Sequence, residues 1–278
     1  RVSRAALHMW EEPCISGEHG SGAVFFSGCT LRCIFCQNAE IAAAHVGKKI
    51  TVERLSDIFL ELQDKCANNI NLVTATHFVP QVAEALIKAK NKGLVIPVVY
   101  NSSAYENVST LNMLDGLVDV YLPDMKYIDS RLSAEYSKAP DYADVAKAAI
   151  HEMVRQTGKP EFFIVDDELV KSGRVEAGIM KKGVIVRHLV LPGTTKDSKA
   201  VIKYLIDTYG DDIYISIMSQ YTPFERLKKH PLLSRKVTRK EYNSVVDYAI
   251  DCGINNGFIQ EGDVAEESFI PEFDYEGI

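Results

Sequence analysis

Apolar runs and amphipathic stretches alternate along most of this chain, and the alternation restricts its fold more than any other feature. The runs are rich in β-branched residues, as are strands that a parallel sheet buries on both faces. After each run, apolar residues recur at helical spacing. The sequence therefore predicts an α/β fold of six strand–helix units, wound by right-handed crossovers into a barrel or an open sheet. The predicted strands are residues 22–28, 70–75, 94–100, 117–124, 183–193 and 212–219, and the predicted helices are 51–69, 80–93, 104–116, 141–158, 197–210 and 239–253.

Helix caps and the segments between the units complete this outline. Thr51 and Asp141 stand where the N-caps of two of the helices are expected. A Ser-Gly turn signal inside one long connection predicts a hairpin insertion. We expect a single domain, 1–278, with an N-terminal extension at 1–21, a barrel over 22–260 with its insertion at 161–182, and an acidic tail at 261–278 that packs loosely or is mobile.

Composition and charge exclude several classes of function. The 278 residues are 46% hydrophobic and 25% charged, which is ordinary for a globular protein. The net charge of −7 argues against a nucleic-acid partner, because such proteins are usually basic. No apolar run has the length that spans a membrane, and Glu11 and Glu12 stand where a signal peptide needs apolar residues. We therefore expect a cytoplasmic protein whose clustered cysteines serve metal or redox chemistry.

Three cysteines, Cys29, Cys33 and Cys36, follow the first predicted strand with the spacing C-x3-C-x2-C. Functional residues of parallel α/β folds gather at this end of the strands, and a short loop can direct three sulfurs at one centre. One interpretation is a zinc site with His45 or Cys14 as the fourth ligand. The interpretation we favour is a [4Fe–4S] cluster held by three thiolates, which leaves one iron free to bind a substrate.

The stretch FFSGCTLRCIFCQN, residues 25–38, resembles the cysteine motif of radical S-adenosylmethionine (SAM) enzymes. It is similar in particular to the pyruvate formate-lyase (glycyl radical enzyme) activating enzyme family. Within that family the chain most resembles an uncharacterised activase-like subfamily. The stretches that carry this resemblance are EEPCISG, INLVT-x-TH, YLPD-x-KY, VIVRHLVLPG and MSQYTP, which extend from Glu11 to Pro223.

This resemblance implies a fold and a mechanism. The fold is a partial (β/α)6 TIM-like barrel, in agreement with the six units counted from the pattern. The mechanism is reductive cleavage of SAM at the [4Fe–4S] cluster, with flavodoxin or ferredoxin as electron donor, to give a 5′-deoxyadenosyl radical that abstracts hydrogen. The implied substrate is a glycyl radical enzyme or another protein or peptide. The alternatives are a small-molecule substrate, and a non-catalytic zinc or iron–sulfur protein.

The resemblance also places SAM along the carboxyl ends of the strands. Related enzymes carry a Gly-Gly-Glu motif after the second strand, which contacts the SAM amino group, but this chain has neither the glycine pair nor the acid. The polar residues there are Thr74, Thr76 and His77, and we assign Thr76 and His77 to the cofactor, with a structural turn as the alternative for His77. After the third strand, Asn101 and Ser102 stand where they can hydrogen-bond SAM.

Charged residues mark the fourth and fifth strands. Asp124 and Lys126 match the Asp-x-Lys that lies beside SAM in the activating enzymes; the alternative is a salt bridge that closes the barrel end. A charge inside the apolar strand 183–193 is costly unless it is paired. Arg187 in that strand matches an arginine near SAM in the activating enzymes. Because adjacent strand residues face opposite ways, His188 is then expected to be a buried structural residue.

Two further segments have candidate contacts. After the sixth strand, Gln220 is assigned to the cofactor, and Ser219 and Tyr221 are candidates for adenosine or substrate contacts, or for a polar edge without ligand contact. The basic stretch 226–240 is expected to be a solvated surface, with docking of an acidic flavodoxin as the alternative.

Three cysteines lie outside the motif. Cys14 is expected to be either a small buried hydrophobe or part of an auxiliary metal site. Cys66 and Cys252 fall at apolar helix positions and are expected in the core.

Overall fold

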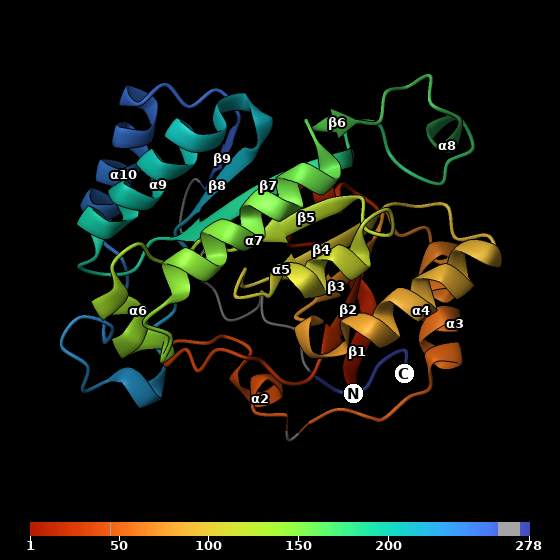
Figure 1. Ribbon diagram of the computed structural model, residues 1–278, viewed down its shortest axis with the longest axis horizontal. Helices are drawn as coiled ribbons and strands as arrows, with labels where there is room; N and C mark the ends of the chain where they lie inside the picture. Colours follow the sequence, from red (N-terminus) through yellow and green to blue (C-terminus); the bar gives the residue numbers. More distant parts are fainter. Residues whose placement is uncertain (45, 261–272) are drawn as a thin grey trace.

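One curved sheet organises the computed structural model, which describes residues 1–44, 46–260 and 273–278 (Figure 1). The strand order is β1-β2-β3-β4-β5-β7-β8-β9, with β6 pairing β7 beside this path. Only β1 and β6 run antiparallel to their neighbours among the described strands. Since each crossover moves the chain one strand further, the parallel strands form a partial barrel. The strands are β1 (Val2–His8), β2 (Ser21–Phe26), β3 (Ile70–Val73), β4 (Val98–Ser102), β5 (Val120–Pro123), β6 (Glu161–Phe162), β7 (Met180–Leu189), β8 (Tyr214–Met218) and β9 (Gly257–Ile259).

Helices cover the outer face of this sheet, and α7 crosses in front of it in Figure 1. Residues such as Leu62, Leu86 and Ile150 bury their side chains against the strands and form one continuous core. No helix within the described residues is long and apolar enough to cross a membrane. The helices are α1 (Pro13–Ser16), α2 (Ala39–Ala42), α3 (Val52–Asp64), α4 (Val79–Asn91), α5 (Val108–Leu111), α6 (Ser130–Ser137), α7 (Tyr142–Thr157), α8 (Glu168–Lys171), α9 (Thr195–Tyr209) and α10 (Arg239–Asp251), with short 3-10 turns η1 (Thr76–Phe78), η2 (Asn112–Leu114), η3 (Gly210–Asp212) and η4 (Glu225–Leu227).

The predicted α/β fold is confirmed, and all six predicted strands are present as β2, β3, β4, β5, β7 and β8. The six predicted helices correspond to α3, α4, α5, α7, α9 and α10. Thr51 is the N-cap of α3, and its hydroxyl accepts a hydrogen bond from the Arg54 N–H at 3.1 Å. Asp141 precedes α7, but its carboxylate makes no cap bond and instead accepts from the Tyr105 hydroxyl at 2.7 Å.

The core assignment of Cys66 is wrong. Helix α3 ends at Asp64, and Cys66 lies two residues beyond, exposed and with a left-handed φ of 62°. The helical spacing of apolar residues in the sequence thus extends to Cys66, although the helix itself has already ended. Cys252 is half-buried at the C-cap of α10, so it lies at the edge of the core.

Two segments outside the six units, residues 161–182 and 273–278, contact the sheet. Residues 161–182 contain β6, which pairs antiparallel with the start of β7, and α8, which lies on a loop that extends from the body in Figure 1. Residues 273–278 pack against β1 and β2, because Asp274 pairs with Arg4 at 2.7 Å and Phe273 contacts the Phe25 ring. Residues 273–278 of the predicted acidic tail thus contact the sheet, and its part at 261–272 lies outside the described residues.

The amino end of the barrel is filled by α1. Cys14 and Ile15 form an apolar cluster with Val99, Leu122 and Ile185 from three neighbouring strands. The backbone of α1 is fixed there as well, since the Ile15 carbonyl accepts from Asn69 at 2.7 Å. This cluster, called the floor below, also includes Val120 and Met180. Because the floor excludes water from one end, the open end for a ligand is at the carboxyl ends of the strands.

Candidate active site

A cavity of about 240 Å³ opens at the carboxyl ends of the strands. Its wall combines the loop after β2 with residues from the ends of β3, β4, β5, β7 and β8. The structure thus brings together ten residues that the sequence analysis named as site candidates. They are Cys29, Cys33, Cys36, Thr74, Asn101, Ser102, Asp124, Lys126, Arg187 and Gln220.

The three motif cysteines lie on the loop between β2 and α2, called the cysteine loop below (residues 27–38). Neighbouring segments fix this loop through its backbone. The Ile34 N–H donates to the Tyr136 carbonyl at 2.8 Å, and the Arg226 guanidinium donates to the Ile34 carbonyl at 2.9 Å. Gln37 also donates to the Gln220 carbonyl at 3.0 Å. The loop is therefore held by α6 on one side and by the segment after β8 on the other.

Two thiols of the cysteine loop, those of Cys29 and Cys36, have a raised pKa and so favour the protonated form in the absence of a metal. Burial raises the pKa of Cys29, although the Leu31 N–H works against this. Burial raises the pKa of Cys36 to about 11, and the nearby Cys33 and Cys29 thiols add to the effect. Metal binding at such thiols releases protons, and backbone N–H groups aimed at the sulfurs stabilise the thiolates that result.

The donors on the cysteine loop are three thiols. No three His, Cys, Asp or Glu side chains within the described residues converge on a metal-sized centre. The donors are nevertheless present, because Cys29, Cys33 and Cys36 line one cavity on one short loop. Thiolates are the ligands that iron–sulfur clusters use, so the cysteines fit such a group. Of the two candidates for a fourth zinc ligand, His45 lies outside the described residues and Cys14 belongs to the floor.

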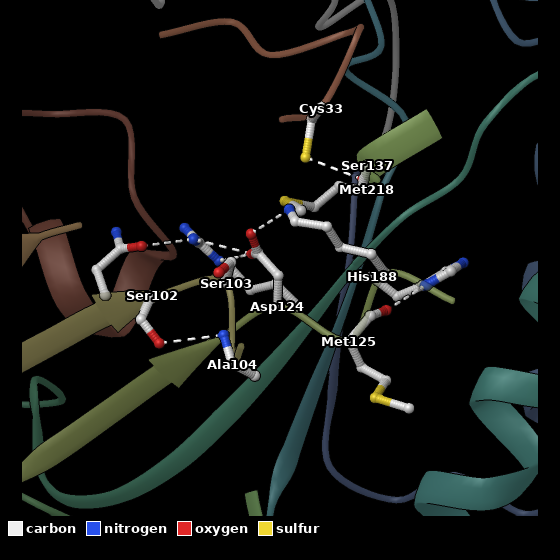
Figure 2. A network of polar contacts seen from close by, with 12 residues as sticks. Cys33, Ser102, Ser103, Ala104, Asp124, Met125, Ser137, His188 and Met218 are labelled. Atoms are coloured by element: carbon white, nitrogen blue, oxygen red, sulfur yellow. Dashed lines mark hydrogen bonds and ion pairs between the residues drawn. The ribbon is translucent and has the colours of Figure 1, made fainter. Parts of the chain in front are cut away.

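Arg187 is the centre of the polar network on the cavity wall, and its partner Asp124 is labelled in Figure 2. Its guanidinium pairs with Asp124 at 3.0 Å and with Glu11 at 3.1 Å, and donates to the Asn101 side chain at 2.7 Å. Asp124 also accepts from the Lys126 ammonium at 2.6 Å, while Asn101 donates to Glu11 at 3.2 Å. The cost of burying one charge in an apolar strand is thus offset by two carboxylates.

Asp124, Lys126 and Arg187 of this network stay charged. Burial tends to raise the pKa of Asp124, but Lys126 and Arg187 outweigh it, so the pKa lies below its usual value. Burial tends to lower the pKa of Lys126 and of Arg187, but Asp124 outweighs it in both cases and the pKa values are raised. The Asp124 and Lys126 side chains keep 18% and 17% of their surface exposed. A ligand in the cavity therefore meets an ionised carboxylate and an ionised ammonium side by side.

Tyr142 of α7 fixes the backbone that carries Asp124 and Lys126. Its hydroxyl accepts from the Lys126 N–H at 3.0 Å and lies 2.7 Å from the Asp124 carbonyl and 2.9 Å from that of Ser103. The side chain is fully buried. The Asp-x-Lys pair is therefore placed by the core and not only by its own salt bridge.

Two residues that the sequence assigned to the cofactor, Thr76 and His77, are not among the residues that line the cavity, and neither is His188, which was expected to be a buried structural residue. Thr76 lies in η1 and donates to the buried Glu106 at 2.6 Å. The His77 ring packs closely against Gly28. His188 faces away from Arg187, and its Nδ1 bonds the Met125 carbonyl at 2.8 Å. Burial lowers the pKa of His188 to about 4, so this residue is neutral and structural at physiological pH.

The segment after β8 contributes one lining side chain and one structural one. Gln220 lines the cavity, whereas Ser219 and Tyr221 are not among its lining residues. The Tyr221 hydroxyl donates to the Leu233 carbonyl at 2.6 Å, and its ring contacts Phe35 of the cysteine loop. Tyr221 therefore supports the loop from behind.

Sequence reasoning missed Glu11 as a site residue. Glu11 follows β1 and reaches the cavity from the amino end, where it bonds Arg187, Asn101 and Asn71. The one available signal was the unpaired arginine in an apolar strand, which required a carboxylate partner without showing which one. Together with Asp124, Glu11 supplies the carboxylates among the described lining residues.

Family comparison agrees with this site. A sequence model of the Radical SAM superfamily matches residues 23–205, which is more than half of the chain and includes the cysteine loop. The chain belongs to the radical SAM superfamily. Members are in general enzymes that catalyse radical reactions, and membership implies an iron–sulfur cluster and SAM. The three motif cysteines and the Asp124–Lys126–Arg187 network lie within the matched residues.

Individual relatives add the fold. The uncharacterized protein MJ0674 of Methanocaldococcus jannaschii is 28% identical over 250 residues, which is 87% of this chain and 65% of that protein. The chain thus spans less than two thirds of this relative. Streptococcus suis SuiB bound to its precursor peptide SuiA matches with a TM-score of 0.55 and 14% identity over 86% of this chain and 48% of SuiB. SuiB bound to SAM matches with a TM-score of 0.54 and 14% identity over 85% of this chain and 49% of that one.

Proposed function

We propose that this radical SAM protein binds a [4Fe–4S] cluster through Cys29, Cys33 and Cys36 and cleaves SAM reductively in the adjoining cavity. Cys29, Cys33 and Cys36 would hold the cluster, which when bound would supply an electron and an iron free of protein ligands for cleavage of SAM to a 5′-deoxyadenosyl radical that takes hydrogen from a substrate. One observation carries the proposal. The three motif thiols and the Asp124–Lys126–Arg187 network line the same cavity.

The charged network suits the methionine end of SAM. That end carries an ammonium and a carboxylate, and charge-assisted hydrogen bonds to such groups are the strong ones. Asp124 is the acceptor for the ammonium, and Lys126 and Arg187 are the donors for the carboxylate. Since Arg187 already bonds Glu11 and Asn101, the network is arranged before the ligand arrives.

The apolar part of the wall has a separate task. Phe25, Phe26, Ile41 and Leu189 line the cavity together with the charged residues. Such a wall keeps water and stray hydrogen donors from a reactive radical. The proposed cleavage site is therefore polar where SAM is anchored and apolar where the radical is formed.

Thr74 marks the place where related enzymes carry Gly-Gly-Glu. It follows β3, lines the cavity and holds a left-handed φ of 59°. This conformation is strained for a β-branched residue, and such strain is concentrated at functional sites. We therefore include Thr74 among the SAM contacts, although it has no carboxylate. Thr76 and His77 lie behind this turn and act as its support.

The finer role that we propose is activase-like, with a glycyl radical enzyme or another protein or peptide as substrate. The resemblance of five separate sequence stretches to the activase-like subfamily supports it. Flavodoxin or ferredoxin is the proposed electron donor, in the reducing cytoplasm. The basic segment 226–240 is a suitable place for an acidic donor, because Arg226 bonds the backbone of the cysteine loop.

The test of SAM cleavage is an anaerobic assay for 5′-deoxyadenosine. The protein is reconstituted with iron and sulfide, reduced with dithionite and incubated with SAM. We expect 5′-deoxyadenosine from the wild type and none above background from Cys33→Ala. A reconstituted wild-type protein that holds iron and sulfide but forms no 5′-deoxyadenosine would overturn the proposal.

Metal analysis separates this function from a non-catalytic metalloprotein. Zinc in the purified protein with no uptake of iron and sulfide would favour a structural site. The protein-directed role needs a further test, in which candidate glycyl radical enzymes are incubated with the active protein and examined for a glycyl radical signal. Turnover of a small molecule without any such signal would favour the alternative substrate class.

A further inference from the structure

A chain of two hydroxyl groups leads from the protein interior to one sulfur of the cysteine loop. The Cys33 Sγ atom lies 3.0 Å from the Ser137 Oγ atom, at the end of α6 (Figure 2). The Ser137 Oγ atom lies 3.0 Å from the Tyr127 hydroxyl. Both Ser137 and Tyr127 are only 1% exposed. The Tyr127 hydroxyl therefore contacts the Ser137 hydroxyl, and the Ser137 hydroxyl contacts the sulfur, with almost no access for water to either residue.

Metal binding would fix the direction of these hydrogen bonds. A thiolate that ligates a metal accepts hydrogen bonds and cannot donate one. The Ser137 hydroxyl has one proton, so it donates to Cys33 and accepts from Tyr127. Burial raises the pKa of Tyr127 well above 10, so its phenol keeps the proton that this arrangement needs.

We propose that Ser137, polarised by Tyr127, sets the reduction potential of the cluster that the cysteine loop holds. This inference rests on the proposed function, since it requires a cluster on Cys33. Reduction adds negative charge to a cluster and its sulfurs, and a hydrogen bond to a ligand sulfur stabilises that charge. A donor that itself accepts a hydrogen bond is the stronger for it.

Ser137 differs in kind from the other hydrogen-bond donors to the sulfurs of the cysteine loop. The Leu31 and Asn38 N–H groups aimed at Cys29 and Cys36 belong to the backbone, so a side-chain change leaves them in place. The donor to Cys33 is a side-chain hydroxyl on another element of the fold. The potential is thereby coupled to α6, which directly follows the Asp124–Lys126 segment in the chain.

The backbone holds Ser137 beside Cys33 without help from the hydroxyl. The Arg32 N–H donates to the Ser137 carbonyl at 3.2 Å, and the Ile34 N–H donates to the Tyr136 carbonyl at 2.8 Å. These two bonds flank Cys33 in the sequence. Removing only the Ser137 hydroxyl therefore leaves the loop anchored to α6.

The experiment is a redox titration of the reconstituted protein, in which the reduced cluster is followed by its paramagnetic signal. For Ser137→Ala we expect the ratio of reduced to oxidised cluster at a fixed solution potential to fall about tenfold, which is about 59 mV for a one-electron couple. Tyr127→Phe should lower the ratio by a smaller factor, and Ser137→Thr should restore it. Iron and sulfide content is measured first in every variant.

Ser133→Ala is the matched control. Ser133 lies one turn earlier on the same helix, is fully buried, and donates to the Ser130 carbonyl at 3.1 Å. This variant should titrate like the wild type. If the reduction potential of Ser133→Ala shifts as far as that of Ser137→Ala, the effect comes from a change in the helix and the proposal is overturned.

The remaining outcomes separate the inference from the proposed function. A wild type without iron and sulfide overturns both. A wild type with a cluster and an unchanged potential in Ser137→Ala overturns the inference alone. If Ser137→Ala fails to assemble, Tyr127→Phe decides, because it leaves Ser137 in place: a lowered potential supports the proposal and an unchanged one overturns it.

Discussion

The barrel interior has two levels that differ in chemistry although the same strands build both. Val99 on β4, Leu122 on β5 and Ile185 on β7 belong to the apolar floor. Two residues further along the chain from each of these stands a polar residue of the network, namely Asn101, Asp124 and Arg187. Residues i and i+2 face the same side of a strand and lie about 7 Å apart along it. This distance separates the floor, which excludes water, from the charged network in the cavity.

The floor determines how the network behaves. It removes water from beneath the charges, which strengthens their mutual attraction and also raises the cost of leaving one unpaired. The network meets this cost with two cations and two carboxylates in direct contact. A ligand with an ammonium and a carboxylate therefore finds charges that are already oriented.

Cysteines show the same contrast. Cys14 lies in the floor, where burial and then Glu12 raise the pKa of its thiol to about 12. Cys29, Cys33 and Cys36 line the cavity, where backbone N–H groups and the Ser137 hydroxyl approach their sulfurs. Cysteine thus occurs in both the floor and the cavity, and its position decides whether the thiol packs in the core or is available as a metal ligand.

Substitution of single cysteines tests the contrast between the floor and the cavity with the largest expected effect. We expect Cys29→Ala, Cys33→Ala and Cys36→Ala each to abolish cluster assembly, because the cysteine loop supplies three thiolates and the cluster would need all of them. Cys14→Ala should retain it. The measurement is iron and sulfide content after anaerobic reconstitution, and loss of the cluster in Cys14→Ala would show that the ligand assignment is wrong.

Arg187→Met tests the network as a unit. The change leaves the Asp124 and Glu11 carboxylates without their shared cation, and breaking a buried pair in this way costs about 3–5 kcal/mol. The free energy of unfolding from urea titration measures the loss. A change below about 1 kcal/mol would mean that water reaches these carboxylates and that the floor does not isolate them.

Glu106 is a buried carboxyl whose described partners are hydroxyls, in contrast to Asp124 with its two cations. It accepts from Thr76 and Tyr100, and burial raises its pKa from 4.5 to about 7. Between these values the folded state keeps a proton that the unfolded state has lost, so stability falls as the pH rises from 4.5 to 7. The integrated loss is about 3 kcal/mol.

The check on Glu106 is the pH dependence of the free energy of unfolding in wild type and Glu106→Gln. The variant should lack that part of the fall with rising pH. Identical pH profiles for the two proteins would mean that the carboxyl is solvated in the folded state.

Ile185→Val gives the smallest effect and serves as the matched change for Arg187→Met on the same strand. Removing one methylene from the floor should cost about 0.5–1.5 kcal/mol. SAM cleavage should stay at the wild-type rate, because Ile185 belongs to the floor and does not line the cavity. A large fall in the rate of SAM cleavage with little loss of stability would show that Ile185 acts on the cavity. The assigned boundary between the floor and the network would then be wrong.

The larger elements of this fold were accessible from the sequence. Continuous apolar runs are a strong local signal, so β7 with its embedded Arg187 was predicted together with the need for partners. The cysteine spacing located the loop because ligation requires a fixed arrangement along the chain. Asp124 and Lys126 followed from their place at a strand end.

Long-range partners were not accessible in the same way. Glu11 reaches the network only because β1 runs antiparallel at the sheet edge and returns the chain to the amino end of the barrel, and an edge strand of mixed polarity gives a weak signal. Ser137 lies on a helix that the pattern did not mark. Cys66 shows the opposite error, since apolar spacing continued beyond the helix end.

The most direct test is the paramagnetic spectrum of the reduced, reconstituted protein before and after addition of SAM. We predict that SAM changes the signal of the wild-type cluster, because the open iron and the Asp124–Lys126–Arg187 network would bind the cofactor together. A cluster whose spectrum is the same with and without SAM, or a site that holds only zinc, would contradict the assignment of this cavity as the place where SAM is cleaved.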